Sequence, residues 1–315
     1  MRRLLFLGMC VLWLAAVGIS FAQDDDRPLP DVITVENAGV LPEGIVWDEV
    51  GERFIHGSLS QGTIYAVEDD GSTTPLIENE DFISTVGLHI DTATNRLLIA
   101  HSDSTIFQGE SPTEHTAALY AYDLETNELL FFSDFTNLYL DPIHFANDVT
   151  VDDEGNAYVT DSMAPIIFRI DTEGNAEIFI EDMRLYAPIV GLNGIEYHPD
   201  GYLLAVVTTA GRLYKIPLDD PSAISQVETS EPIFGDGMTW FGEDLAVVSL
   251  NTVKILHSDD DWETATVIAQ SSNDLEGATT VTTREDALYA VLANIADPDA
   301  PTFDIVRVEL AETNH

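Results

Sequence analysis

The sequence predicts an all-β fold, a six-bladed β-propeller closed by an N-terminal strand that joins the last blade. Six segments repeat one pattern, in which a polar residue, usually followed by glycine, precedes a short apolar alternation, a turn and a second apolar run. These segments follow one another at steps of 40 to 61 residues, about the length of one four-stranded blade. After residue 22, no segment of useful length has the periodicity of a helix.

The first strand of each blade begins at one polar repeat position. The residues at that position are Glu43, Val86, Asn147, Asn193, Asp236 and, with an alignment that can shift by a residue or two, Glu276. Residues 44–47 and 193–197 alternate with period two, as a strand requires. Asp, Asn and Gly in residues 152–156 and 198–201 supply the turns to the second strands.

Further strands and the ring closure follow from the same pattern. We expect third strands at residues 62–67, 118–122, 166–170 and 211–216, and weaker fourth strands such as residues 176–180. Residues 32–35 can add the missing outer strand beside residues 303–308. This pairing would close the ring and leave no open sheet edge there.

The N-terminal residues are predicted to direct export. Arg2 and Arg3 precede the apolar residues 4–22, which end in Ser-Phe-Ala, so residues 1–22 read as a secretory signal peptide. Residues 23–30 would be a flexible acidic leader and residues 31–315 the propeller, secreted or periplasmic. The alternative is an uncleaved membrane anchor, since the apolar stretch is just long enough to span a bilayer.

Charge and cysteine content exclude several classes of function. The chain has 12 Lys and Arg against 56 Asp and Glu, a formal net charge of −44. Such a surface repels nucleic acid and anionic membranes, so neither is an expected partner once the signal is removed. The single cysteine, Cys10, lies in the signal segment, which leaves the mature chain without disulfides or zinc-thiolate sites.

Four polar residues are predicted to converge at one end of the central channel. Because first strands line the channel of a propeller, the residues that begin them meet from different blades. Glu43, Asn147, Asn193 and Asp236 then form an all-oxygen set of two carboxylates and two amides. Such a set suits one divalent cation, above all Ca²⁺. The alternative is that these residues only cap turns at the strand starts.

Several of these motifs together resemble the SMP-30/gluconolactonase/LRE-like family. The resemblance rests on Leu41-Pro42-Glu43-Gly44-Ile45, Phe145-Ala146-Asn147-Asp148-Val149, Leu192-Asn193-Gly194-Ile195 and Asp236-Gly237-Met238. It implies that Glu43, Asn147, Asn193 and Asp236 bind one divalent metal, and that the chemistry is hydrolysis of a lactone or related ester. Asp236 and Glu43 are then the expected catalytic residues, with Asp236 or an activated water attacking the substrate.

The sequence departs from that family in the region before Asn147. Sugar-lactonase members carry an arginine where this chain has Phe145, which favours a more apolar small-molecule substrate. Only Asn147-Asp148 keeps a pair typical of paraoxonase-like members with a second metal, so one metal is expected. The histidine that those members carry in the second blade is replaced by Val86.

Other residues are candidates for the surroundings of the site. His56, His101 and His144 lie near the ends of second strands or beside such loops and could shuttle protons, or could be ordinary packing residues. Asp148 and Glu276 complete the candidate set. Phe107, Tyr139, Ile143 and Phe145, in the long segments 101–116 and 133–146, could form an apolar lid or mere interblade padding.

The competing interpretation is a secreted binding module without turnover, in which calcium only orders the strand ends. Propellers are common interaction platforms, and the fold alone does not establish chemistry. The complete set of four oxygen ligands favours the hydrolase.

Overall fold

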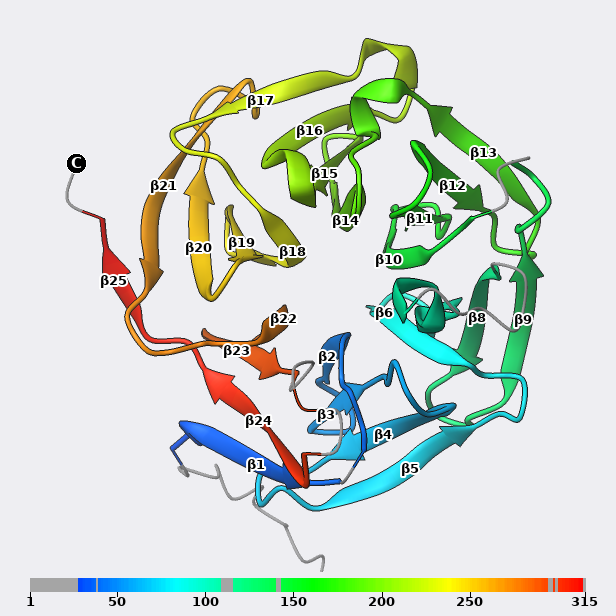
Figure 1. Ribbon diagram of the computed structural model, residues 1–315, viewed down its shortest axis with the longest axis vertical. Coiled ribbons are helices and arrows are strands. Elements are labelled where there is room, and N and C mark those ends of the chain that lie inside the picture. The colour runs from blue at the N-terminus through cyan, green and yellow to red at the C-terminus, as the bar shows by residue number, and fades with distance from the viewer. Residues whose placement is uncertain are drawn as a thin grey trace, which may run out of the picture.

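The computed structural model describes residues 28–37, 39–108, 116–139, 143–293, 297 and 300–313. These residues form six antiparallel blades around a common axis, which confirms the predicted propeller (Figure 1). The predicted signal peptide and most of the leader lie outside the described residues. No helix in the described part of the chain is long and apolar enough to cross a membrane.

The first three blades are four-stranded sheets in simple chain order. Blade 1 contains β2 (Ile45–Asp48), β3 (Arg53–His56), β4 (Thr63–Val67) and β5 (Thr73–Glu78). Blade 2 contains β6 (Ser84–Asp91), β7 (Arg96–Ser102), β8 (Ala117–Asp123) and β9 (Leu129–Asp134). Blade 3 contains β10 (Ala146–Val151), β11 (Ala157–Asp161), β12 (Ile166–Ile170) and β13 (Ala176–Glu181).

The remaining blades include two additions to this plan. Blade 4 contains β14 (Leu192–His198), β15 (Tyr202–Val207), β16 (Arg212–Pro217) and β17 (Ser225–Thr229). Blade 5 contains β18 (Gly235–Phe241), β19 (Asp244–Ser249), β20 (Thr252–His257) and β21 (Thr264–Ser271), with β25 (Leu310–Glu312) paired to β21. Blade 6 contains β22 (Ala278–Arg284), β23 (Ala287–Leu292), β24 (Thr302–Arg307) and β1 (Val32–Glu36). Short 3₁₀ helices are η1 (Ser104–Gln108), η2 (Met183–Leu185), η3 (Thr208–Ala210) and η4 (Pro221–Ala223).

Strand β1 closes the ring as the sequence predicts. It pairs antiparallel with β24, with Val32 opposite Val306 and Val35 opposite Phe303. The Tyr289 hydroxyl donates to the carbonyl of Pro30 at 2.7 Å, which ties the chain just before β1 to blade 6. The N-terminal strand β1 and the late strand β24 therefore share blade 6 (Figure 1).

Blades 4 and 5 are joined by a pairing that the repeat pattern did not predict. The outer strands β17 and β21 run parallel, with Glu228 opposite Thr264 and Thr229 opposite Ala265. The amide of Ser230 donates to the carbonyl of Ala265 at 2.9 Å. These two blades therefore form one continuous sheet, whereas the other blades are separate sheets in the described part of the chain.

The apolar core lies between the blades. Each of six hydrophobic clusters takes residues from two adjacent blades, for example Leu98 of blade 2 with Val149 and Phe168 of blade 3. The last cluster joins Ile33 and Tyr289 of blade 6 to Phe54 of blade 1. Because a blade is covered on both faces, its second strand is buried along its whole length, as β7 shows. Burial between blades thus holds the ring together.

The side chain of Arg284, the last residue of β22, links blade 6 to blade 1. The guanidinium of Arg284, in β22, lies 4.0 Å from the ring centre of Trp47 and forms two bonds to Asp69, at 2.5 and 3.0 Å. The side chain of Arg284 is 9% exposed, while that of Asp69 is 47% exposed. The contact combines a bidentate ion pair with a cation–π interaction across the closure.

We expect Arg284→Met to lower the free energy of unfolding by about 2 kcal/mol, because it removes both interactions and keeps the length of the side chain. Equilibrium urea unfolding measures the change. The control is Arg169→Met, which breaks the more exposed pair with Glu177 and should cost about 0.5 kcal/mol or less. Equal losses in the two variants would contradict a special role of Arg284 in closure.

Candidate metal centre at the channel mouth

Five of the six first strands begin with a β-bulge, whereas β2 of blade 1 pairs with β3 in regular register. Register shifts occur between Ala146 and Val149, between Leu192 and Ile195, and between Gly235 and Met238. Strands β6 and β22 carry equivalent shifts. A bulge turns the extra residue out of the ladder and re-aims its side chain. The predicted residues Asn147, Asn193 and Asp236 are bulge residues of three different blades.

The bulge of the last blade lies later in the sequence than the repeat pattern predicted. Its extra residue is Thr279, between the paired residues Ala278 and Thr280. Glu276 is exposed on the preceding turn, where its amide donates to Asp274. The prediction that Glu276 begins the sixth first strand is therefore wrong. Gly277, at φ 83°, ends the turn, and the strand begins only after it. The pair Glu276-Gly277 resembles Glu43-Gly44 in the sequence, and this likeness hid the later start of the strand.

The four predicted metal ligands come from blades 1, 3, 4 and 5. Glu43, Asn147 and Asn193 are 8%, 6% and 5% exposed, and Asp236 is half-buried. The side chain of Asn193 hydrogen-bonds to the carboxylate of Asp236, and the charge of Asp236 acts on Glu43. The amide nitrogen of Asn147 donates to Ser162 Oγ at 2.8 Å, which in turn donates to the carbonyl of Leu192, next to Asn193.

Burial and mutual repulsion disturb the carboxyl groups at this end of the channel. Desolvation raises the pKa of Glu43 well above its usual value, and the charges of Asp236 and Asp148 raise it further. Desolvation also raises the pKa of Asp236 to about 7, against the opposing hydrogen bond from Asn193. The side chain of Asp236 is partly exposed to solvent, but most of its surroundings are protein atoms. A divalent cation at this point would relieve both the desolvation and the repulsion.

The hydrogen bonds orient the amides so that oxygen is left for a cation. Asn147 and Asn193 each use their side-chain nitrogen as a donor, to Ser162 and to Asp236. Their oxygens, with the carboxylates of Glu43 and Asp236, are the hard ligands that Ca²⁺ prefers. Within the described residues, no group of three or more His, Cys, Asp or Glu residues could hold a metal ion. A metal here would therefore depend on the asparagine oxygens.

Asp148 has a different task from its neighbour Asn147. At the equivalent place other blades have glycine, and a Cβ on Gly44 or Gly194 would lie 2.3 Å from the backbone oxygen of Val86 or Asp236. The Asp148 carboxylate instead accepts the amides of Val149 and, across the blades, Ile195, at 2.9 and 3.2 Å. Burial raises its pKa to about 7. Asp148 thus points below the mouth and joins blade 3 to blade 4.

Below the mouth, the channel contains a cavity of about 280 Å³. Asp148, Glu196 and His89 are among the residues that line it. Burial, with the charge of Asp148, raises the pKa of Glu196 well above its usual value, and burial lowers the pKa of His89 to about 4. Glu196 and His89 were missed in the sequence. Alternation along the first strands, counted from the bulge, could have found both.

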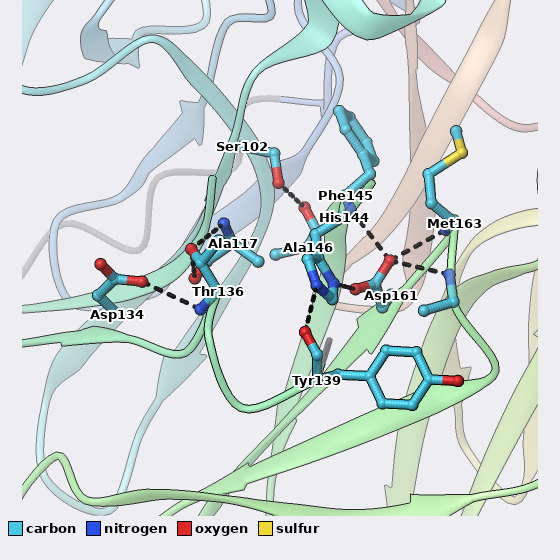
Figure 2. Close-up of polar contacts among 11 residues, drawn as sticks. Ser102, Ala117, Asp134, Thr136, Tyr139, His144, Phe145, Ala146, Asp161 and Met163 are labelled. Carbon is cyan, nitrogen blue, oxygen red and sulfur yellow. Dashed lines mark hydrogen bonds and ion pairs between the residues drawn. The ribbon is translucent and has the colours of Figure 1, made fainter. Parts of the chain in front are cut away.

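His144 is a buried structural residue. Its side chain is 1% exposed, and its Nδ1 and Nε2 lie 2.6 Å from Asp161 Oδ2 and 3.1 Å from the carbonyl of Tyr139 (Figure 2). Asp161 Oδ1 also accepts the amide of Phe145. The contact between His144 and Asp161 therefore supports the chain that leads to Asn147. A proton shuttle at His144 stays a prediction.

His56 and His101 are also inside the protein. Burial lowers the pKa of each to about 4. His56 Nδ1 donates to the carbonyl of Gly57 at 2.8 Å, and His101 Nε2 accepts the amide of Ile83 at 2.9 Å. These described hydrogen-bond partners all lie outside the four-residue set. That one of the three histidines serves the site stays a prediction.

Phe145 connects the site to the long loop of blade 2. Its side chain is 3% exposed, and its ring packs edge-on against Phe107 of η1, with ring centres 5.0 Å apart. Ile143 is 41% exposed, and Tyr139 contributes its carbonyl to His144. An apolar wall therefore stands beside Asn147. The rest of the predicted lid, residues 109–115 and 140–142, lies outside the described residues.

Solved structures resemble this chain in fold. The allergen Mala s 1 of Malassezia sympodialis has a TM-score of 0.72 at 17% identity, covering 90% of this chain and 97% of that one. The gluconolactonase XC5397 of Xanthomonas campestris scores 0.59 at 14% identity, covering 90% and 89%. The calcium-binding protein regucalcin of Agrobacterium tumefaciens scores 0.57 at 17% identity, covering 87% and 92%.

The sequence comparisons extend this likeness to a family. A search of curated protein sequences found no match. The family model described as the SMP-30/Gluconolactonase/LRE-like region matches residues 41–240, from the approach to β2 through most of β18. All four of the predicted ligand residues lie in the matched range. The chain belongs to the SMP-30/gluconolactonase/LRE-like family.

Proposed function

We propose that this protein is a calcium-dependent hydrolase of lactones or related esters, with its site at the channel mouth. The observation that carries the proposal is the group formed by Glu43, Asn147, Asn193 and Asp236, in which two crowded carboxylates meet two oriented amide oxygens. Two structural relatives, one described as a gluconolactonase and the other as the calcium-binding protein regucalcin, support the choice of chemistry and of metal.

The residues of the site have separable tasks in this proposal. A bound Ca²⁺ would stabilise the negative charge that develops on the carbonyl oxygen of the substrate. Asp236, half-buried and held by Asn193, accepts a proton from the attacking water as the general base. Water adds to the carbonyl carbon, the ring C–O bond breaks, and the proton held by Asp236 passes to the leaving oxygen, which yields a hydroxy acid. Glu43 contributes the second negative charge of the site.

The surroundings favour an uncharged substrate of small size. The net charge of −44 disfavours the approach of an anion. Phe145 and Phe107 place an apolar wall beside Asn147. Residues 141–146, just before Asn147, contain no lysine or arginine. We therefore propose a neutral lactone or ester with an apolar portion, rather than a sugar acid.

We further propose that the protein is exported after cleavage behind Ala22. Intact-mass measurement of the exported protein should give an N-terminus at Gln23. A mass that retains Met1 would support the membrane anchor instead.

Hydrolysis should depend on calcium and on Asp236. On a panel of lactones, aryl esters and phosphotriesters, we expect turnover with calcium that is lost in excess chelator. Asp236→Asn should lower kcat/KM at least about 100-fold, because the general base is lost. Asp200→Asn, which removes an exposed carboxylate from a turn at the opposite face, is the matched control and should keep full activity. Full turnover in Asp236→Asn would place the chemistry elsewhere.

Calcium should stabilise the protein more at pH 8 than at pH 6. The raised pKa values of Glu43 and Asp236 mean that the calcium-free folded state holds extra protons, which must leave before the cation binds. Without calcium, stability should therefore fall as the pH rises from about 4 through 7. At pH 8, millimolar calcium should raise the melting temperature by roughly 5 °C, and by clearly less at pH 6. An equal shift at both pH values would contradict this assignment of the ligands.

A further inference from the structure

Exposed apolar side chains gather on one face of the described structure. We call the face where the first strands begin the mouth face. Because the strands of each blade alternate in direction, loops that enter a first strand and loops that join second to third strands all emerge there. Eight large apolar side chains between 38% and 77% exposed lie in such loops: Leu138 and Ile143 before β10, and Phe107, Met183, Tyr186, Ile189, Phe234 and Leu250. We call this set the apolar rim.

The opposite face is different. Its loops join first to second strands and third to fourth strands, and they are rich in Asp, Glu, Asn and Gly, as in residues 152–156 and 171–175. In the loops of that face that the structure describes, Val50 is the one large apolar residue among the exposed side chains, at 84%. The mouth face has the longer loops, yet exposed apolar side chains also occur in its short loops, as Phe234 and Leu250 show. Loop length alone therefore does not produce this asymmetry.

One member of the rim is held in an unfavourable backbone conformation. Ile189 has φ 78°, a region that β-branched residues rarely adopt, and its side chain is 77% exposed. The amides of Thr208 and Thr209 donate to the carbonyls of Gly191 and Val190, which fixes the loop next to Ile189. A fixed loop that presents a strained apolar side chain to solvent is typical of a binding position.

Three members of the apolar rim are linked to the candidate metal centre, two through the sequence and one through a ring contact. Ile189 and Phe234 precede Asn193 and Asp236 on the loops that enter those first strands. Phe234 lies over the turn at Gly211, where an added Cβ would approach its ring to 3.1 Å. Phe107 contacts Phe145, which stands beside Asn147. The rim therefore begins where the carbonyl of a substrate would be held.

We propose that the apolar rim binds an extended alkyl or aryl group of the substrate, so that the natural substrates are lactones or esters with a long apolar chain. The inference rests on the proposed hydrolase function and assigns its substrate class. The net charge of −44 disfavours an anionic lipid surface as the occupant. A neutral chain leading away from the site matches both the apolar side chains and the acidic surroundings.

The test uses p-nitrophenyl esters with 2 to 12 acyl carbons and the mature protein with calcium. We expect kcat/KM to rise about twofold to fourfold for each added methylene until the rim is covered. Ile189→Asn, in which the new residue tolerates positive φ, combined with Phe234→Ser should lose about tenfold on the decanoate and less than twofold on the acetate. Val50→Ser on the opposite face is the matched control and should keep the chain-length dependence.

The outcomes separate this inference from the hydrolase proposal. If kcat/KM does not depend on chain length, or if the dependence persists in the double variant, the proposed role of the apolar rim is wrong. The hydrolase proposal is unaffected by either result. If no ester is cleaved, binding of the neutral apolar fluorophore N-phenyl-1-naphthylamine decides: weaker binding in the double variant alone supports the rim, and equal binding overturns it. Rim-dependent sedimentation with phosphatidylcholine vesicles, without chain-length preference, would assign the surface to a membrane and overturn the proposal.

Discussion

The close approach of six first strands around a narrow axis is the constraint on which this structure depends. At Gly44 and Gly194 the neighbouring backbone lies where a Cβ would stand. The strands can come so near because glycine takes up no room there, and the bulges then turn the preceding residues, such as Asn193, toward the axis. Where glycine is replaced by Asp148, the carboxylate bonds across the same junction. One packing requirement thus creates both the ring and its polar mouth.

The polar mouth is electrostatically expensive in the absence of a counter-charge. The ionised carboxylates of Glu43 and Asp236 would be more stable in water, and the raised pKa values of both groups reflect the free-energy cost of burying them. The residues beside them are supported by the hydrogen bond from Asn147 to Ser162 and by the buried His144–Asp161 contact behind Phe145. A rigid support around strained carboxylates is the arrangement that a functional ion site requires.

Much of the fold and part of the site could be predicted from the sequence, because the repeat is local and regular. The closing pair of β1 and β24 followed from an unpaired apolar segment at each end of the chain. The misplacement of Glu276 arose because a turn ending at Gly277 imitates the start of a strand. The β17–β21 pairing, the burial of the three histidines and the exposure of Ile189 depend on contacts between distant segments, which no local pattern encodes.

The closure has a kinetic consequence. The Thr34 hydroxyl bonds to Asp304, a separation of 270 residues, so the strand that emerges early in synthesis must wait for one of the last. Contacts of such long range carry a large loop-closure entropy and slow folding. Until β24 arrives, β1 and the open side of blade 6 are unpaired edges, exposed to other chains. For a protein made from the N-terminus, the pairing of β1 with β24 makes closure of the ring a late step of assembly.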